Sequence, residues 1–314
     1  MPIEFNSSEN VIATSEIQSF SQKKEVTQVA EEQEQLTLDS NSSIYGLSSA
    51  EYSDPNNIVV TIANTSAPLV VLFGPPACGK TMTLVRLTRF LKEEGYVVSP
   101  IRTFRPSIDT HYADLCQNFD KMINNNNAAH STDLISFMLI EVLKDGRPIC
   151  QILEAPGEYY FKPEEPQRPF PVYVNKIISS TNRKIWAVMV EPDWYDFEDR
   201  LNYVNRVASL KRVMRPSDSV LFVYNKIDKT NFVRSVGNIN TQEAIKNIKY
   251  LYPGIFTPFE NQNPITKWFK QYNCDFIPFQ TGTYTTSTTG LTYVDGPREY
   301  CVKLWSKLMN KIKG

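Results

Sequence analysis

The sequence lacks the long hydrophobic run that a membrane-spanning helix requires. None of its apolar stretches approaches the roughly 20 residues needed to cross a bilayer. The first residues, "MPIEFNSSEN", show no basic segment followed by an apolar one, and neither end carries a lipidation motif. We therefore expect a protein without a membrane anchor.

Cysteine and histidine are scarce as well. The five cysteines are widely spaced without a CxxC pair, and His111 and His130 are the only histidines. This pattern excludes a dense disulfide framework and argues against a metal motif built from histidines. It favours a reducing, cytoplasmic location.

Charge is nearly balanced over the whole chain but unevenly distributed. The formal net charge is −1, of which residues 1–56 contribute −8, so residues 57–314 carry +7. A mild positive excess suits polyanionic ligands such as nucleotides, but it lacks the clustered footprint of a nucleic-acid-binding protein. We expect no nucleic-acid partner.

Composition divides the chain into two parts. Residues 1–56 are rich in Ser, Asn, Gln and Glu and contain no Trp, so they cannot bury enough apolar surface to offset the entropy of ordering. We expect a disordered tail there, either a solvated leader or an acidic arm that binds a partner. A single folded domain is expected over residues 57–314.

The folded part alternates short, β-branched apolar segments with longer amphipathic ones. This alternation predicts an α/β fold, with a mixed, mostly parallel sheet flanked by helices. Asp145 and Gly146 predict a tight turn that joins two antiparallel strands. The expected strands are 58–63, 69–73, 133–143, 149–154, 185–190, 219–224 and 275–279, and the expected helices are 80–94, 111–123, 196–214, 241–250 and 298–312.

One loop carries a phosphate-binding pattern. The stretch "GPPACGKT" satisfies G-x-x-x-x-G-K-[ST] and lies between a predicted buried strand and a predicted helix start. Its glycines let the backbone curl so that amides point at phosphate oxygens, while Lys80 bridges phosphates and Thr81 offers a hydroxyl to Mg²⁺. The residues expected to bind the phosphates are Gly74, Ala77, Cys78, Gly79, Lys80 and Thr81.

A second pattern indicates which base is bound. The sequence "NKID", which supplies Asn225, Lys226 and Asp228 at the end of a predicted strand, resembles the N-K-x-D element of the P-loop GTPases. A carboxylate accepts hydrogen bonds from both N1–H and the exocyclic amine of guanine, whereas adenine has no such donor pair. We expect Asp228 to read the base. The resemblance implies that Lys226 lies along the base plane and that Asn225 binds the ring or ties this segment to the phosphate loop.

A third element is altered. The sequence "ILEAPGEYY" is similar to the D-x-x-G element that senses the γ-phosphate, with Gly157 as the amide donor and Glu154 where the family has Asp. Glu154, which is one methylene longer than Asp, would still reach a water molecule bound to Mg²⁺. Because this ion demands near-ideal octahedral geometry, the family's arrangement cannot be carried over unchanged.

The resemblance further implies a threonine ligand of Mg²⁺ from the first switch loop. We expect Thr132, which lies 22 residues before Glu154, in competition with Ser131 and Thr110. The alternative is that Thr132 simply starts a strand. Gln280 and Thr281 match the position, but not the residues, of the family's base-contacting S-A element.

The resemblance to Ras-like and translation-related P-loop GTPases covers residues 66–312. Within it, residues 95–131 form an insert that makes this segment longer than in a minimal small GTPase. That insert is either an elaborated first switch or a docking element, or, as we favour, a helix that covers the core. The divergent second switch and the long polar leader also suggest the GTPases of bacterial conflict systems.

The catalytic residues implied by the resemblance are Lys80, Thr132 and Glu158. Glu158 stands where Ras-like members place the glutamine that orients the attacking water, and its charge predicts slow hydrolysis. Arg102, Arg105 or a partner's arginine are candidates for stabilising the transition state, and the alternative for Arg102 and Arg105 is that they are ordinary solvated surface residues. The aromatic residues of 158–174 either dock a partner or pack on the body.

Together these patterns predict a slow GTPase switch that uses GTP, GDP and Mg²⁺ and that contacts an unknown effector or activator through its switch loops. Two alternatives stay open. One is a pseudo-GTPase scaffold that binds guanine nucleotide without hydrolysis, and the other is a P-loop ATPase or kinase in which "NKID" is accidental.

Overall fold

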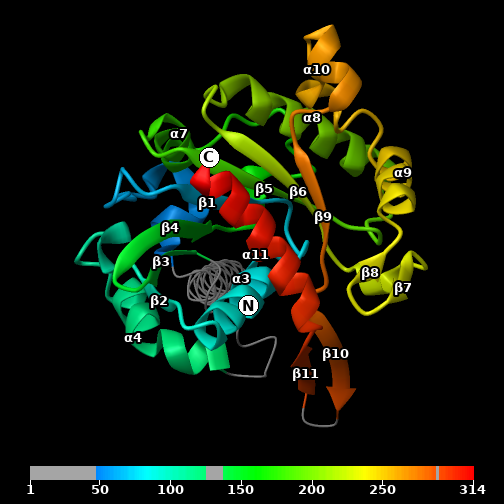
Figure 1. The fold of residues 1–314 in the computed structure, drawn as a ribbon. Coiled ribbons are helices and arrows are strands. Elements are labelled where there is room, and N and C mark those ends of the chain that lie inside the picture. Colours follow the sequence, from blue (N-terminus) through cyan, green and yellow to red (C-terminus); the bar gives the residue numbers. More distant parts are fainter. Residues whose placement is uncertain (1–46, 125–136, 288–289) are drawn as a thin grey trace, which may run out of the picture.

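The computed structural model describes residues 47–124, 137–287 and 290–314. One large sheet dominates it. Its strands are β1 (Leu69–Phe73), β2 (Val97–Pro100), β3 (Met138–Lys144), β4 (Arg147–Glu154), β5 (Lys184–Val190), β6 (Ser219–Tyr224) and β9 (Asp275–Pro278). They are arranged in the order β2-β3-β4-β1-β5-β6-β9, as Figure 1 shows.

Only β3 runs against the other strands of this sheet. It pairs antiparallel with β2 and β4, whereas β4, β1, β5, β6 and β9 are parallel to one another. The expected mixed, mostly parallel sheet is therefore confirmed. The β3–β4 turn is the predicted one, with Asp145 and Gly146 both left-handed at φ of 51° and 72°.

Smaller elements surround the sheet. Two antiparallel pairs are formed by β7 (Val233–Ser235) with β8 (Asn238–Ile239), and by β10 (Gly282–Ser287) with β11 (Gly290–Asp295). The described α-helices are α2 (Ser49–Ser53), α3 (Lys80–Glu93), α4 (Thr110–Asn124), α6 (Gly157–Tyr160), α7 (Val172–Ser179), α8 (Phe197–Val213), α9 (Thr241–Leu251), α10 (Pro264–Phe269) and α11 (Arg298–Lys313). Short 3₁₀ turns are η1 (Pro55–Asn57), η2 (Arg102–Phe104), η3 (Ile227–Lys229) and η4 (Thr257–Phe259).

The central strand β1 is buried because its sequence, "LVVLF", presents apolar side chains to both faces of the sheet. The chain leaves β1 through α3 toward β2, and it later passes through α8 from β5 to β6 on the other side of β1. Right-handed crossovers in opposite directions place these helices on opposite faces. In Figure 1, α11 and α3 lie together across the near face.

This reversal of direction at β1 positions the site. In open α/β sheets, ligands bind beyond the carboxyl ends of the strands at the point where the strand order reverses. The loop after Phe73 leaves the sheet there, between the carboxyl ends of β4 and β5.

The predicted strand at 58–63 is wrong. Within it, the amide of Thr61 donates to the Phe104 carbonyl at 2.8 Å and Lys176 donates to the Val60 carbonyl at 2.5 Å. These single contacts hold an extended segment against the body, but they do not form a ladder with a neighbouring strand. The strand predicted at 133–143 begins at Met138, and residues 133–136 lie outside the described part of the chain.

The last part of the segment predicted as a disordered tail, residues 47–56, is folded. From Leu47, which is buried, the chain packs on the body through α2 and η1. The Glu51 carboxylate forms an ion pair of 2.6 Å with Arg105. Residues 1–46 lie outside the described part of the chain.

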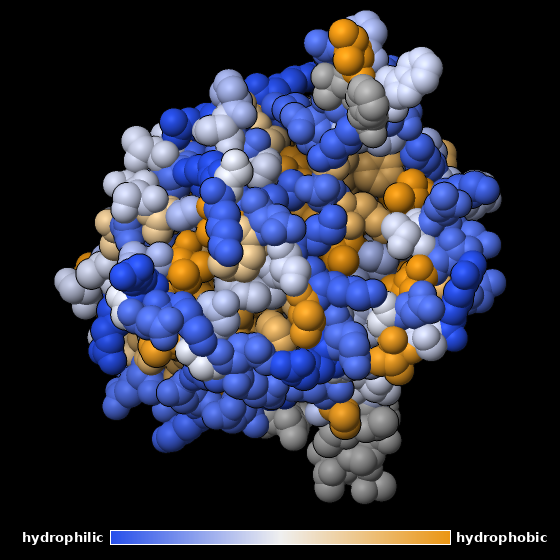
Figure 2. Space-filling view, viewed as in Figure 1, coloured by the Kyte–Doolittle hydropathy of each residue, from blue (hydrophilic) through white to orange (hydrophobic). Residues whose placement is uncertain are grey.

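The surface shown in Figure 2 is mostly hydrophilic, with hydrophobic residues scattered among polar ones, which is ordinary for a folded domain. Among the helices that the structure describes, none combines the length and the apolar character needed to cross a membrane.

Candidate functional site

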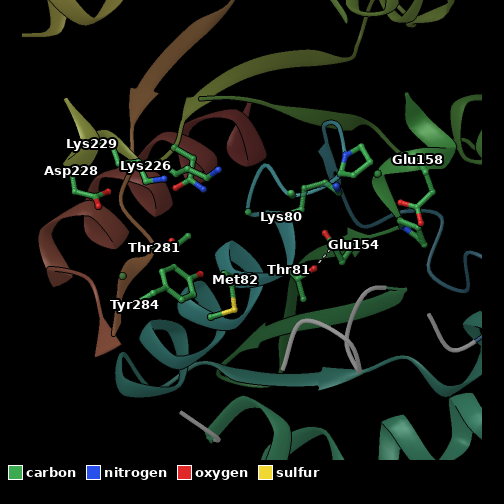
Figure 3. A pocket seen from close by; sticks show the side chains of 17 residues that line it. Lys80, Thr81, Met82, Glu154, Glu158, Lys226, Asp228, Lys229, Thr281 and Tyr284 are labelled. Carbon is green, nitrogen blue, oxygen red and sulfur yellow. Dashed lines mark hydrogen bonds between the residues drawn. The ribbon is translucent and has the colours of Figure 1, made fainter. Parts of the chain in front are cut away.

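A pocket of about 450 Å³ opens beyond the carboxyl ends of the central strands. Its lining comes from the loops that follow β1, β4, β6 and β9, together with the starts of α3 and β10. Figure 3 shows Lys80, Thr81, Glu154 and Glu158 toward one end and Asp228 and Tyr284 toward the other. We call these the phosphate end and the base end.

At the phosphate end, the loop after β1 wraps around the Lys80 ammonium. Lys80 is 5% exposed, and its Nζ donates to the Gly74 carbonyl at 3.2 Å and to the Pro75 carbonyl at 2.9 Å. Ala77 and Gly79 have left-handed backbones, with φ of 59° and 88°, and Gly79 precedes the first turn of α3. A positive side chain and a helix N-terminus thus meet in one concave loop, which is an arrangement that attracts anions.

The glycines of the loop are required by close packing. A Cβ on Gly74 would lie 2.6 Å from Cys78 Sγ, and one on Gly79 would lie 2.3 Å from Asn225 Nδ2. Asn225, which is buried, donates from Nδ2 to the Cys78 carbonyl at 3.0 Å. Of the two roles implied for Asn225, the structure shows the tie between the "NKID" segment and the phosphate loop.

Thr81 and Glu154 form a second polar feature at the phosphate end. The Thr81 hydroxyl donates to Glu154 Oε1 at 2.9 Å, while the buried Oε2 of Glu154 has no hydrogen-bond partner. Burial raises the pKa of Glu154 to about 8, against the lowering effects of the Lys80 charge and the Thr81 hydrogen bond. A carboxylate oxygen that lacks a partner is suited to receive a cation.

This donor set fits Mg²⁺. The described residues contain no cluster of three or more His, Cys, Asp or Glu side chains that would hold a metal by themselves. Mg²⁺ is usually held by one or two protein oxygens together with substrate phosphates and water, so Thr81 and Glu154 suffice only alongside a phosphate. Thr132, expected as a further ligand, lies outside the described residues.

Gly157 and Glu158 close the phosphate end. A Cβ on Gly157 would lie 2.4 Å from the Pro76 nitrogen and 2.6 Å from Lys80 Nζ, so this glycine lies directly against the phosphate loop. Glu158 follows it in the first turn of α6, and its charge contributes to the raised pKa of Glu154. The next aromatics, Tyr159, Tyr160 and Phe161, are buried, so in this structure they pack on the body.

At the base end, Asp228 is exposed and lines the pocket. Although the residue as a whole is exposed, partial burial of its carboxyl group raises the pKa of Asp228. Lys226, with a left-handed backbone at φ 55°, forms an ion pair with Glu191 and a longer one, of 3.4 Å, with Asp193. Lys229 also pairs with Asp193.

Several residues at the base end and next to it were not predicted from the sequence. Glu191 and Asp193 pair with Lys226 but line a neighbouring cavity rather than this pocket. They follow β5, so their position at a strand end was a usable signal. Met82 and Tyr284 do line the pocket, although neither belongs to a motif that would have predicted this. Of the pair expected after β9, Thr281 lines the pocket and Gln280 does not.

Neither arginine proposed for transition-state stabilisation lines the pocket. Arg105 is 3% exposed and pairs with Glu51 and Asp109, and it donates to the Val59 carbonyl at 3.0 Å. Its guanidinium group is therefore engaged in contacts that stabilise the fold. Arg102 belongs to a separate cavity beside α4.

No protein-family model matches the chain, and no curated protein matches it. Among solved structures, the chain is similar to nucleolar GTP-binding protein 1 from Plasmodium falciparum, with 15% identity and a TM-score of 0.38 over 81% of this chain and 92% of that one. It is also similar to the Roco2 RocCORdC protein of Methanosarcina barkeri bound to GDP, with 12% identity and a TM-score of 0.32 over 82% of this chain and 53% of that one. Both overlaps are loose.

Proposed function

We propose that this protein binds a guanine nucleotide together with Mg²⁺ and hydrolyses GTP slowly. One observation carries the proposal: a single pocket holds the Lys80 loop at one end and Asp228 at the other, and Asn225 bonds the two segments together. A nucleoside triphosphate has the matching polarity, with anionic phosphates at one end and a base with hydrogen-bonding edges at the other.

Binding is divided between the two ends of the pocket. The Lys80 ammonium, held by the Gly74 and Pro75 carbonyls, exchanges these weak partners for phosphate oxygens. The Asp228 carboxylate accepts from N1–H and the amine of guanine. Adenine would leave that carboxylate unpaired, which is the physical basis of discrimination.

Thr81 and Glu154 would hold Mg²⁺ alongside the phosphates. When bound, the ion neutralises charge that develops on the transferring phosphoryl group. The chain's own contribution is to keep the Thr81 hydroxyl and a buried Glu154 carboxylate 2.9 Å apart at the mouth of the phosphate loop.

Turnover is slow because Glu158 supplies a negative charge where a neutral water-orienting group is needed. Catalysis of phosphoryl transfer depends mainly on positioning and charge stabilisation, and a carboxylate beside the γ-phosphate opposes the second. The same observation supports the second candidate, a scaffold that binds GTP without cutting it. A single-turnover hydrolysis assay separates the two candidates. A protein effector or activator would contact the segment that follows Gly157.

The test of base recognition is Asp228→Asn. Xanthine carries a carbonyl where guanine carries an amine. The variant's amide should therefore weaken the affinity for GTP and strengthen the affinity for XTP, each by roughly 100-fold. The matched control is Asp193→Asn, which changes an acid that pairs with Lys226 and Lys229 but does not line this pocket. It should keep the preference for GTP. A preference for ATP that survives Asp228→Asn would replace the proposal with a P-loop ATPase or kinase.

A further inference from the structure

Tyr284, on β10, lies at the base end of the pocket although it belongs to no recognisable motif. It lines the pocket together with Thr281 and Gly282, and its side chain is 43% exposed. In Figure 3 the ring lies beside Met82 and Thr281, on the side of the pocket where Asp228 is found. A large ring half-exposed inside a polar pocket is available to a ligand.

The ring is held in place from behind. Tyr284 lies opposite Tyr293 in the β10–β11 register, with ring centroids 5.4 Å apart. Tyr293 is buried, and its hydroxyl donates to the Thr281 carbonyl at 2.7 Å. A Cβ on Gly282 would lie 2.4 Å from the Tyr293 ring, so the glycine permits this close approach.

The β10–β11 hairpin is also fastened to the helix that begins in the phosphate loop. Asp295 forms ion pairs with Arg89 at 2.8 Å and with Arg86 at 3.4 Å, and Arg86 donates to the Gly296 carbonyl at 3.0 Å. Both arginines lie on α3. The distance between the phosphate loop and the hairpin is therefore fixed by direct contacts.

The charges near Tyr284 agree with this placement. Partial burial raises the pKa of Tyr284, a hydrogen bond with the Thr281 side chain and the Lys226 charge lower it, and the Asp228 charge raises it. The phenol stays protonated and neutral at neutral pH. An uncharged aromatic face thus lies beside the carboxylate assigned to the edge of the base.

We propose that Tyr284 is the aromatic wall on which the nucleobase stacks. This inference rests on the proposed function for the existence of a bound nucleotide, but it does not depend on which purine is bound. Stacking on an aromatic ring tolerates any base, because every base has a π-face. Tyr284 should therefore contribute to affinity for purine nucleotides without choosing between them, whereas Asp228 should choose.

The experiment compares GDP and ADP, which carry a base, with inorganic tripolyphosphate, which does not, on the full chain. Tyr284→Ala should weaken GDP binding by about tenfold or more and leave tripolyphosphate unchanged. Tyr284→Phe, which keeps the ring, should stay within about twofold of the native chain. Tyr250→Ala removes a tyrosine that is 79% exposed on α9 and should change neither affinity.

The outcomes separate this inference from the proposed function. Unchanged GDP binding in Tyr284→Ala would overturn the stacking role, and so would a parallel loss of GDP and tripolyphosphate, which shows a structural effect. If the native chain prefers ADP to GDP, the guanine assignment fails, and the same comparison is then run with ADP. A native chain that binds tripolyphosphate no less tightly than either nucleotide would overturn both.

Discussion

The two ends of the pocket are built in different ways. The phosphate end comes mainly from one loop of eight consecutive residues, 74–81, whose backbone carbonyls hold Lys80. The base end is assembled from segments far apart in the chain, around Asp228, around Thr281 and at the start of α3, and it combines the exposed Asp228 and Tyr284 with the buried Met82 and Thr281. A short motif can specify the first, whereas only the fold can assemble the second.

The difference also bears on what each end can recognise. Backbone amides and an ammonium group bind any phosphate chain, so the phosphate end should not distinguish one base from another. Selectivity requires side chains that match the edge of one base, and these lie at the other end.

The largest effect is expected from Lys80→Ala. Loss of a charge-assisted contact to phosphate should weaken the binding of GTP by about 100-fold. The binding of ATP should weaken by the same factor, because the lysine does not contact the base. Equilibrium titration with both nucleotides measures this. Lys92→Ala, on the same helix and paired with Asp120, is the matched control. A loss confined to GTP would contradict the division of roles.

A smaller effect is expected where the two ends are joined. Asn225→Ala removes the bond to the buried Cys78 carbonyl and should cost about 1–3 kcal/mol of stability, because that carbonyl is left unpaired. Nucleotide affinity should fall about tenfold with it, since the base segment then moves independently of the phosphate loop.

The control for Asn225→Ala is Asn247→Ala. Asn247 accepts a hydrogen bond of 2.6 Å from the hydroxyl of Tyr224, the residue that precedes Asn225 in the chain. Neither Tyr224 nor Asn247 lines the pocket. This variant should lose stability in thermal unfolding without losing affinity. Equal affinity losses in the two variants would show that Asn225 has no special role.

A change in rate rather than in affinity is expected from Glu158→Gln. The amide can orient water without adding negative charge, so single-turnover hydrolysis should become roughly tenfold faster. Glu164→Gln, at an exposed carboxylate of the same segment, should leave the rate unchanged. An unchanged or lower rate in Glu158→Gln would show that Glu158 is not what limits hydrolysis.

The smallest effect on nucleotide binding is expected from Glu51→Ala, outside the pocket. Burial would raise the pKa of Glu51, but the hydrogen bonds from Arg105 and Ser48 and the Arg105 charge hold it below the usual value. Its contribution to stability is thus present above the unfolded pKa of about 4.3 and is lost as the pH falls through the lower folded pKa.

The variant should accordingly lose about 1–2 kcal/mol of stability at pH 7 and less at pH 3, with nucleotide affinity unchanged. Urea unfolding at the two pH values checks this. A stability loss of the same size at pH 3 would contradict the ion pair with Arg105 as its source.

The central sheet was predictable because its strands are continuous apolar runs bounded by turns. The segments 69–73, 185–190 and 219–224 bury both faces, which leaves no alternative pattern. The segment 58–63 has the same local character, yet it found side-chain and loop partners instead of a strand. Sequence cannot show which partner an isolated apolar segment meets.

Elements formed from weak local patterns were missed. The strand "GTYTTS" of β10 is rich in Thr and has little apolar alternation, and its partner is fixed by Tyr293 and by contacts to α3. The helix α7 follows a proline-rich stretch that reads as a loop. For the same reason, the short motifs named Lys80, Thr81 and Glu154, which line the pocket, whereas no motif named Tyr284 or Met82.

The most direct test of the account is a titration of the native chain with GTP and with ATP in the presence of Mg²⁺. A pocket that reads guanine through Asp228 should bind GTP at least about 100-fold more tightly than ATP, because ATP leaves the carboxylate without its two donors. Equal affinities, or a preference for ATP, would contradict the central claim that the base end selects guanine.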